Sequence, residues 1–368
     1  MTMKSTVTEV CAGYGEIAKI LRDEIHNGAY ADSDSFPSLT KIMQRFGVSR
    51  PSAVRSVAEL KRLGLVTAKR GSGTFVSRQN RTIGLVIPGT ADSEFFSAIM
   101  DGLVCNCDQC GMDLVAGDVF PVNHKLRNDQ AERLARHLVS LPAAGVIMQP
   151  VAFHEDAERV NGVIADILGE AGIPVVLIDY DIVQPPDRSG YDLVAIDNFS
   201  AGRRVAAHLI EVGAKRICCL LCGLSAESVH TRFAGVEAEY HRAFPDRHVD
   251  VIMAKADDER AIAAGLEEFR PDAIVCSNDV AAVALATTLE NLGVRIPNDI
   301  MLAGFDDVRL AGEMKPGLTT IHQPCFEIAT TAFRTLLERM KNPGLPPRQI
   351  LLEAPLVIRE STGKKARQ

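Results

Sequence analysis

Basic and small polar residues gather in residues 49–76, which read "SRPSAVRSVAELKRLGLVTAKRGSGTFV". Arg50 is expected at the start of a helix, where its guanidinium can donate to O6 and N7 of one guanine and contribute about 1–3 kcal/mol of discrimination. The run Lys69-Arg70-Gly71-Ser72-Gly73-Thr74 is expected to form the tip of a two-stranded wing. A short helix beside a flexible basic ribbon is typical of a winged helix-turn-helix domain that reads DNA.

Other side chains near this helix are suited to the phosphate backbone. Serines close to helix N-termini can bind anions, and Lys and Arg neutralise phosphate charge. Glycines would let the wing approach a groove closely. The predicted DNA contacts are Ser38, Lys41, Ser49, Arg50, Ser52, Arg55, Lys69, Arg70, Gly71 and Gly73. For Lys41 and Arg55 the alternative is an ordinary solvated position on a helix face.

The charge of the chain is divided unevenly along its length. Residues 1–80 hold twelve Lys and Arg against seven Asp and Glu, a net charge of +5. The whole chain carries −7, so residues 81–368 carry −12. A basic N-terminal part can approach nucleic acid phosphates, while an acidic body is repelled by them.

Three helices and a strand pair are expected to position the basic residues. Apolar residues at helical spacing follow Tyr14, and a second helix is predicted to begin after Ser38 as N-cap and to end at Gly47. Ser49 is predicted to cap the third helix, which Gly64 would end. The predicted domain comprises residues 1–76, followed by a polar linker over 77–81.

From residue 82 onward, continuous apolar strands alternate with helices. Such strands are typical of parallel sheets buried on both faces, with helices as right-handed crossovers. The pattern restarts near Leu193, which predicts an α/β fold with two Rossmann-like lobes over residues 82–362. The N-lobe is expected to hold about 82–196 and 324–345, and the C-lobe about 197–323 and 346–360. Ligands of such sheets bind beyond the carboxyl ends of the strands.

Bulk composition restricts the class of protein. The 368 residues are 46% hydrophobic and 24% charged, which is ordinary for a globular protein of two or three compact units. No apolar run reaches the roughly 18 residues of a membrane span, and the N-terminus lacks the apolar core of a secretory signal. We therefore expect a cytoplasmic protein without a membrane partner.

Two groups of cysteines invite a metal or redox interpretation. Cys105, Cys107 and Cys110 lie at the end of a predicted helix, and "CCLLC" supplies Cys218, Cys219 and Cys222. Neither group has the second CxxC of a zinc finger. Packing as small apolar side chains is the favoured interpretation, with reduced thiols expected in a cytoplasm, and no metal or cofactor is predicted.

Residues 14–76 resemble the GntR family of winged-helix regulators. The resemblance rests on Tyr14, "LRDEIHNGAY", Pro37-Ser38, "FGVSR", "AELKRLGLV" and "GSGTFV". In that family the second helix usually opens with "SERE", whereas this chain has "SLTK". Thr40 and Val54 thus stand where arginine is common, so the operator sequence is not transferable from relatives.

Residues 82–360 resemble the effector domain of the LacI family, which is related to periplasmic sugar-binding proteins. The matching segments are "TIGLVIP", "IPVVLIDYD", "VAIDNFSAGRRVAAHLIEVGAKRI", "RFAGVEA", "DAIVCSNDVAAVAL", "VRIPNDIMLAGFDDV" and "LTTIHQP". A GntR-type head on a LacI-type body is similar to the bacterial arabinose repressors.

The second resemblance implies a set of effector contacts. Asp179 and Asp279 follow strands and Arg232 begins a helix, each at a position that binds effector in LacI-like proteins. Carboxylates and a guanidinium fork suit the hydroxyls of a polyol. The predicted effector contacts are Phe95, Phe96, Asp179, Arg232, Asp279 and Gln323.

Structural alternatives exist for three of these residues. Asp279 could cap the helix after Asn278, Asp179 could end its strand in a turn, and Arg232 could pair with a surface carboxylate. The chain has no Trp, so any stacking surface for a sugar ring must come from Phe or Tyr.

Taken together, the resemblances imply a transcriptional regulator whose ligand controls DNA binding. We expect a repressor that binds double-stranded operator DNA as a homodimer and a small-molecule effector, a sugar, between the lobes. A non-sugar effector or no effector are the alternatives. Catalysis is not expected, because the chain lacks GxSxG, GxxxxGK[ST], HExxH and a GxGxxG after the first strand of the body.

Overall fold

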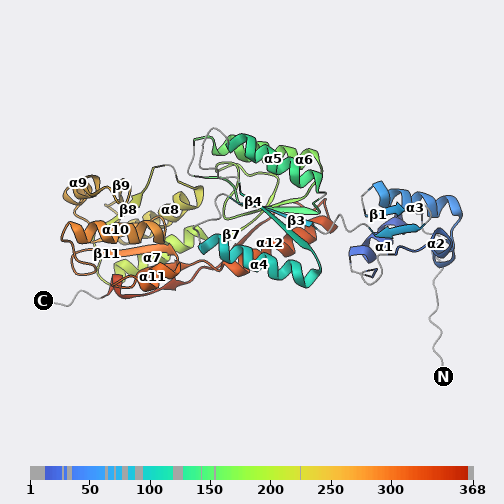
Figure 1. Cartoon of the computed structure of the whole chain (residues 1–368). Helices are drawn as coiled ribbons and strands as arrows, with labels where there is room; N and C mark the ends of the chain where they lie inside the picture. The colour runs from blue at the N-terminus through green and yellow to red at the C-terminus, as the bar shows by residue number, and fades with distance from the viewer. Residues whose placement is uncertain are drawn as a thin grey trace, which may run out of the picture. The chain divides into compact units, whose positions relative to one another are not determined.

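The computed structural model describes residues 13–26, 29–30, 35–62, 65–69, 72–76, 82–87, 94–118, 127–141, 143–152, 155–223 and 225–363. The chain forms two compact units, one of which contains the N-terminal residues up to Thr82 and the other nearly all of the remainder (Figure 1). The N-terminal unit is called the head below, and the larger unit is called the body.

In its described residues the head has three helices and a strand pair. Its elements are α1 (Tyr14–His26), α2 (Leu39–Phe46), α3 (Arg50–Arg62), β1 (Val66–Lys69) and β2 (Gly73–Val76). The two strands pair antiparallel, with Val66 opposite Val76 and Lys69 opposite Gly73. Apolar side chains from all five elements form one core, which includes Ile17, Ile42, Leu60, Val66 and Val76.

Local signals in the head sequence explain where its helices begin and end. The Ser38 Oγ accepts a hydrogen bond from the Lys41 N–H at 3.3 Å, and Gly47 ends α2 with φ of 62°. The predicted cap and turn are therefore confirmed. The buried Ser56 hydroxyl donates to the Tyr14 carbonyl oxygen at 2.8 Å and so ties α3 to α1.

The N-lobe of the body is a six-stranded sheet with helices on both faces. Its strand order is β13-β7-β6-β5-β3-β4, and α5 and α6 lie on the face opposite α4 and α12 (Figure 1). The strands are β3 (Thr82–Ile87), β4 (Asp113–Asp118), β5 (Gly145–Met148), β6 (Val175–Ile178), β7 (Asp192–Ile196) and β13 (Gln349–Leu352). The helices are α4 (Glu94–Cys110), α5 (Arg127–Ser140), α6 (Ala157–Glu170) and α12 (Cys325–Lys341).

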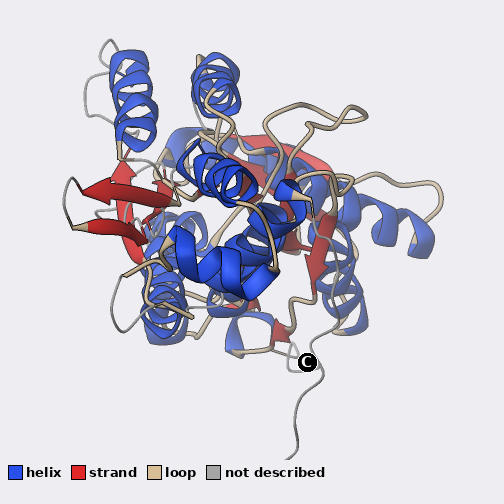
Figure 2. Cartoon of the chain, turned by 90° about the vertical axis from the view of Figure 1, so that its right-hand side faces the viewer, coloured by secondary structure: helices blue, strands red, loops and turns tan. Residues whose placement is uncertain are grey.

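The C-lobe repeats the arrangement with the strand order β14-β12-β11-β10-β8-β9. Its strands are β8 (Ile217–Leu221), β9 (Asp250–Met253), β10 (Ala273–Cys276), β11 (Met301–Asp306), β12 (Thr319–His322) and β14 (Leu356–Val357). Its helices are α7 (Asn198–Glu211), α8 (Glu227–Ala243), α9 (Glu259–Phe269), α10 (Asp279–Asn291), α11 (Arg309–Glu313) and the 3-10 turn η3 (Glu360–Thr362). Figure 2 distinguishes these helices, strands and loops by colour.

The predicted fold class is confirmed, because each lobe contains a parallel sheet with crossover helices. One lobe boundary was wrong. Residues 346–360 were assigned to the C-lobe, yet β13 pairs in parallel with β7 of the N-lobe, with Gln349 opposite Leu193. The chain returns to the C-lobe only at β14, which pairs antiparallel with β12.

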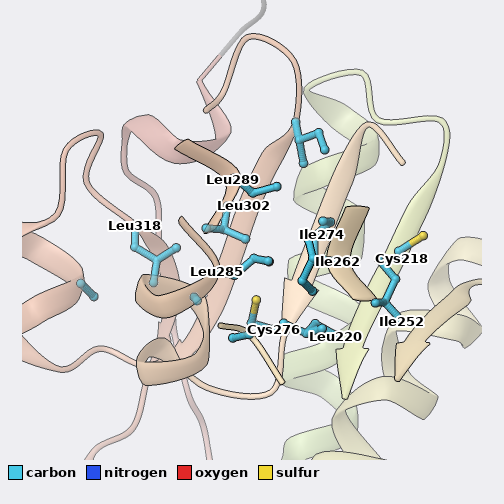
Figure 3. Close-up of a cluster of buried hydrophobic side chains, with 14 residues drawn as sticks. Cys218, Leu220, Ile252, Ile262, Ile274, Cys276, Leu285, Leu289, Leu302 and Leu318 are labelled. Carbon is cyan, nitrogen blue, oxygen red and sulfur yellow. The ribbon is translucent and has the colours of Figure 1, made fainter. Parts of the chain in front are cut away.

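The C-lobe core shows how the cysteines of β8 are used. Cys218 and Cys276 lie among the side chains of Leu220, Ile252 and Ile274 and are fully buried (Figure 3). Burial raises the pKa of the Cys218 thiol to about 12, so the thiol is neutral. Cys218 therefore packs as an apolar side chain, and among the described residues no cluster of three or more His, Cys, Asp or Glu could hold a metal ion.

Candidate functional site

A cavity of about 270 Å³ lies between the two lobes of the body. Polar side chains enter it where strands end: Gln149 follows β5, Asp179 follows β6, and Asp306 ends β11. This is the carboxyl edge at which parallel sheets bind ligands. The wall consists of Phe95, Phe96, Gln149, Ala152, Asp179, Tyr180, Ala226, Ser228, Val229, Arg232, Asn278, Asp306 and Gln323.

The N-lobe wall of the cavity contains two hydrogen-bond acceptors that have no partner among the residues that the structure describes. The Gln149 Nε2 donates to Asp179 Oδ2 at 3.1 Å, which leaves Gln149 Oε1 and Asp179 Oδ1 buried and unpaired. Burial raises the pKa of Asp179, although the Arg232 guanidinium, Ser228 and Gln149 oppose that rise. Unpaired buried acceptors are costly, so a ligand that donates to both atoms would be favoured.

The C-lobe wall is built around Arg232, whose side chain is only 4% exposed. Its Nε donates to Asn198 Oδ1 at 2.7 Å and its Nη1 to the Ser277 carbonyl oxygen at 2.9 Å. The Nη1 also lies 3.9 Å from Asp306 Oδ1, and the guanidinium covers the Phe305 ring at 4.8 Å. The guanidinium is thus held in one orientation before any ligand arrives.

A close crossing of α7 and α8 places Arg232 at this depth. A Cβ added to Gly202 of α7 would lie 1.9 Å from the Arg232 carbonyl oxygen. A Cβ added to Gly235 of α8 would lie 2.1 Å from the Phe199 carbonyl oxygen. Since backbone atoms cannot move aside cheaply, only glycine at both positions lets the helices approach this closely.

Asp306 connects the C-lobe wall to the segment that returns to the N-lobe. The Gln323 Nε2 donates to Asp306 Oδ1 at 2.6 Å. Burial raises the pKa of Asp306 to about 6, whereas the Arg232 guanidinium and Gln323 act in the opposite direction. The backbone of Asp306 is left-handed, with φ of 112°, which is strained for a residue other than glycine.

Aromatic rings supply the apolar part of the cavity. Phe95 and Phe96 stand edge to face with ring centroids 5.5 Å apart. Tyr180 is 8% exposed and its hydroxyl donates to the Pro150 carbonyl oxygen. These three rings are the surfaces against which the carbon face of a ligand can pack.

Five of the six predicted effector contacts come together in this wall: Phe95, Phe96, Asp179, Arg232 and Gln323. That any of them contacts a ligand stays a prediction. Asp279 is different, because it is 0% exposed and does not line the cavity. It does not cap α10 either, since the Asn278 side chain accepts from the Ala281 N–H at 2.8 Å. The direct contact predicted for Asp279 is therefore corrected.

Besides Ser228 in the first turn of α8, three polar wall residues were missed from the sequence: Gln149, Asn278 and Asp306. Each stands at the carboxyl end of a strand, the feature that directed attention to Asp179. The same rule applied to every strand of the body would have found them. The pair Asp306-Asp307 at the end of "LAGFDD" was the clearest signal.

The head places its candidate DNA contacts on α2, α3 and the strand pair. Lys41, Arg50 and Arg55 are exposed, and the Ser49 and Ser52 hydroxyls lie 3.1 Å apart at the start of α3. Val54, where relatives often have arginine, is 43% exposed on the same helix.

Lys69 ends β1, and Gly73 opens β2 with φ of 113°. The side chain of Lys69, together with Arg70 and Gly71, lies outside the described residues.

No helix within the described ranges is long and apolar enough to cross a membrane.

Comparison with known proteins gives matches for both units. Residues 13–76 match the model of bacterial regulatory proteins of the gntR family, and residues 206–362 match the periplasmic binding protein-like domain. The HTH-type transcriptional repressor PurR of Vibrio atlanticus is 30% identical over 294 residues, covering 77% of this chain and 81% of the relative. The ribose operon repressor of Haemophilus influenzae is 26% identical over 326 residues, which cover 85% of this chain and 89% of that repressor.

A solved structure agrees with these relatives. A LacI family transcriptional regulator from Enterococcus faecium with bound ribose has a TM-score of 0.62 and 25% identity, covering 77% of this chain and 99% of its own. The fold and the cavity define a ligand-binding transcriptional regulator. The chain belongs to the LacI family of transcriptional regulators, and its N-terminal domain is of the GntR type.

Proposed function

We propose that this regulator is a repressor whose affinity for operator DNA is set by a small sugar in the cavity between the lobes. The observation that carries the proposal is the pair of unpartnered acceptors, Gln149 Oε1 and Asp179 Oδ1, beside the fixed Arg232 guanidinium. Two neighbouring hydroxyls of a sugar donate hydrogen bonds to Gln149 Oε1 and Asp179 Oδ1. Other hydroxyl oxygens of the sugar accept hydrogen bonds from the Arg232 guanidinium.

The relatives also support a repressor that binds a sugar. Two of the proteins similar to this chain are repressors by name, one of them of a ribose operon, and a regulator of this fold was solved with ribose bound. We therefore propose a pentose or another small sugar as the effector. The cavity binds the sugar without transforming it, and the protein acts in the cytoplasm, where its operator is.

Control of DNA by the cavity requires that the sugar favour one arrangement of the body. A homodimer presents two heads to the two halves of a symmetric operator, and a change in the body alters their spacing. Arg50 is the head residue that we propose reads a base. Arg50→Ala should weaken operator binding by about 1–3 kcal/mol, whereas Lys61→Ala, at the far end of the same helix, should have little effect.

The proposal is tested by calorimetry of the full chain against a panel of aldoses and ketoses. For the measurements of DNA binding, operator fragments are selected from genomic DNA by the protein itself. We expect one sugar class to bind wild type and the control Glu158→Gln, which changes an exposed carboxylate of α6. Asp179→Asn should lose that binding. If no sugar binds wild type while an unrelated metabolite does, the effector class is wrong although the regulator is not.

A further inference from the structure

Asp279 is a buried carboxylate that neither lines the cavity nor caps its helix. It is the first residue of α10 and is 0% exposed. Its Oδ1 accepts a hydrogen bond from the Thr320 hydroxyl of β12 at 2.6 Å, and its Oδ2 accepts from the Val308 N–H at 3.1 Å. Burying a carboxyl group is costly unless its oxygens are hydrogen-bonded, so these two bonds are what allow Asp279 to lie this deep.

The group that these bonds hold is a strained segment at the end of β11. Asp306 has φ of 112° and Asp307 has φ of 57°, so two consecutive residues other than glycine are left-handed. The Val308 N–H that Asp279 accepts from is the next group along the chain. Such conformations persist only where the surroundings over-determine them.

The strand itself leaves space for the carboxylate. A Cβ added to Gly304 of β11 would lie 2.2 Å from Asp279 Oδ1. Gly304 stands opposite Thr320 in the sheet register, so β11, β12 and the start of α10 meet at this one carboxylate.

The strained conformation matters because it directs Asp306 into the cavity. Asp306 lines the wall, accepts from Gln323 and lies 3.9 Å from the Arg232 Nη1. We propose that Asp279 is a positioning residue of the effector site: through Val308 and Thr320 it holds the left-handed segment that points Asp306 at the ligand. This inference rests on the proposed function of the cavity.

The test uses the full-length protein and the sugar that binds wild type most tightly in the panel. Asp279→Asn keeps the shape of the side chain and weakens its acceptors. Thr320→Val, which removes only the hydroxyl donor, serves as the milder variant if Asp279→Asn folds poorly. We expect each variant to raise the Kd of the sugar, by about tenfold for Asp279→Asn, because the amide replaces one of the two oxygens that hold Thr320 and Val308 with an NH2 group that cannot accept a hydrogen bond.

Asp272→Asn is the matched control. The Asp272 carboxylate also accepts backbone N–H bonds, from Lys215 at 3.0 Å and Arg216 at 2.9 Å, but it does not line the cavity. It should lower the melting temperature without changing the Kd. This control separates a loss of stability from a loss of positioning.

A double-mutant cycle with Asp306→Asn decides whether Asp279 acts through Asp306. We expect Asp279→Asn to weaken binding by less than about twofold once Asp306→Asn is present, because the two changes share one route. Additive effects would overturn the proposal, as would an unchanged Kd in both Asp279→Asn and Thr320→Val.

If wild type binds no sugar at all, the proposed function fails first, and the strained segment is then examined by the chemical shifts of residues 306–308 in Asp279→Asn. Unaltered shifts would refute the positioning role.

Discussion

The two walls of the cavity differ in how completely their polar groups are paired. On the N-lobe side, Gln149 Oε1 and Asp179 Oδ1 are buried without a partner in the described part of the chain. On the C-lobe side, Arg232 bonds to Asn198 and to the Ser277 carbonyl, and Asp306 accepts from Gln323. The N-lobe wall therefore offers two free acceptor atoms to a ligand, whereas the C-lobe wall is organised in advance.

This difference suggests how binding and closure are connected in the body. A ligand gains most where acceptors are unsatisfied, and it meets on the other side a guanidinium that needs no reorganisation. Substitutions in the two walls should consequently change stability in opposite directions while both reduce binding.

The C-lobe wall should not tolerate loss of its cation. Arg232→Met removes the charge that faces Asp306 and Asp179, so the free energy of unfolding should fall by about 3–5 kcal/mol and sugar binding should disappear. Urea denaturation and calorimetry measure both effects. Arg295→Ala is the control, because its pair with Asp299 is exposed and should contribute less than about 1 kcal/mol. Equal losses in the two variants would contradict an organised C-lobe wall.

The same wall should depend on the close crossing of α7 and α8. Gly202→Ala places a methyl group 1.9 Å from the Arg232 carbonyl oxygen and should cost about 1–3 kcal/mol of stability as α8 moves away. Sugar affinity should fall with it because Arg232 shifts. Gly162→Ala in α6 meets no atom within 4 Å and should instead stabilise the protein by up to about 1 kcal/mol. Thermal melts of both variants, with and without sugar, make the comparison.

Stability of the ligand-free protein should decline as pH rises. Burial and the neighbouring Asp306 raise the pKa of Asp279 to about 8, and burial raises the pKa of Asp306 to about 6. Both pKa values lie above those of the same carboxyl groups in the unfolded chain. At pH values between the unfolded and the folded pKa, the folded protein therefore binds more protons than the unfolded chain. The free energy of unfolding should therefore fall as the pH rises from about 4 to about 8. Asp279→Asn should flatten this slope, and an unchanged slope would speak against a buried carboxyl group there.

The N-lobe wall should respond in the opposite direction. Burial raises the pKa of Asp179, so ionising it costs free energy in the empty cavity. Asp179→Asn removes that cost, and asparagine tolerates the left-handed backbone found there, with φ of 73°. We expect the ligand-free variant to be more stable by about 1 kcal/mol while sugar binding is lost. Destabilisation in the absence of sugar would show that both walls are organised alike.

Much of the architecture follows from patterns in the sequence, because those patterns are local. Continuous apolar strands predict buried parallel sheets, and Ser38 and Gly47 mark the limits of α2. The lobe of β13 was not predictable in this way. A four-residue apolar strand suits either sheet edge, and only the pairing of Gln349 with Leu193 decides between them.

The candidate site was predictable only to the level of strand ends. Which of two adjacent polar residues faces the cavity depends on the geometry of the helix start. Asn278 takes the cap of α10 and lines the cavity, so Asp279 turns inward to Thr320. Likewise, Asp306 points into the cavity because of a strained backbone that no residue pattern reveals.

In the proposed regulator, filling the cavity changes the affinity of the head for DNA. Its most direct test is the operator Kd, measured by fluorescence anisotropy with and without saturating sugar, for wild type and for Asp179→Asn. We expect a change of about 5- to 150-fold in wild type and none in the variant. An operator Kd that stays constant in wild type while calorimetry shows the cavity to be full would contradict it.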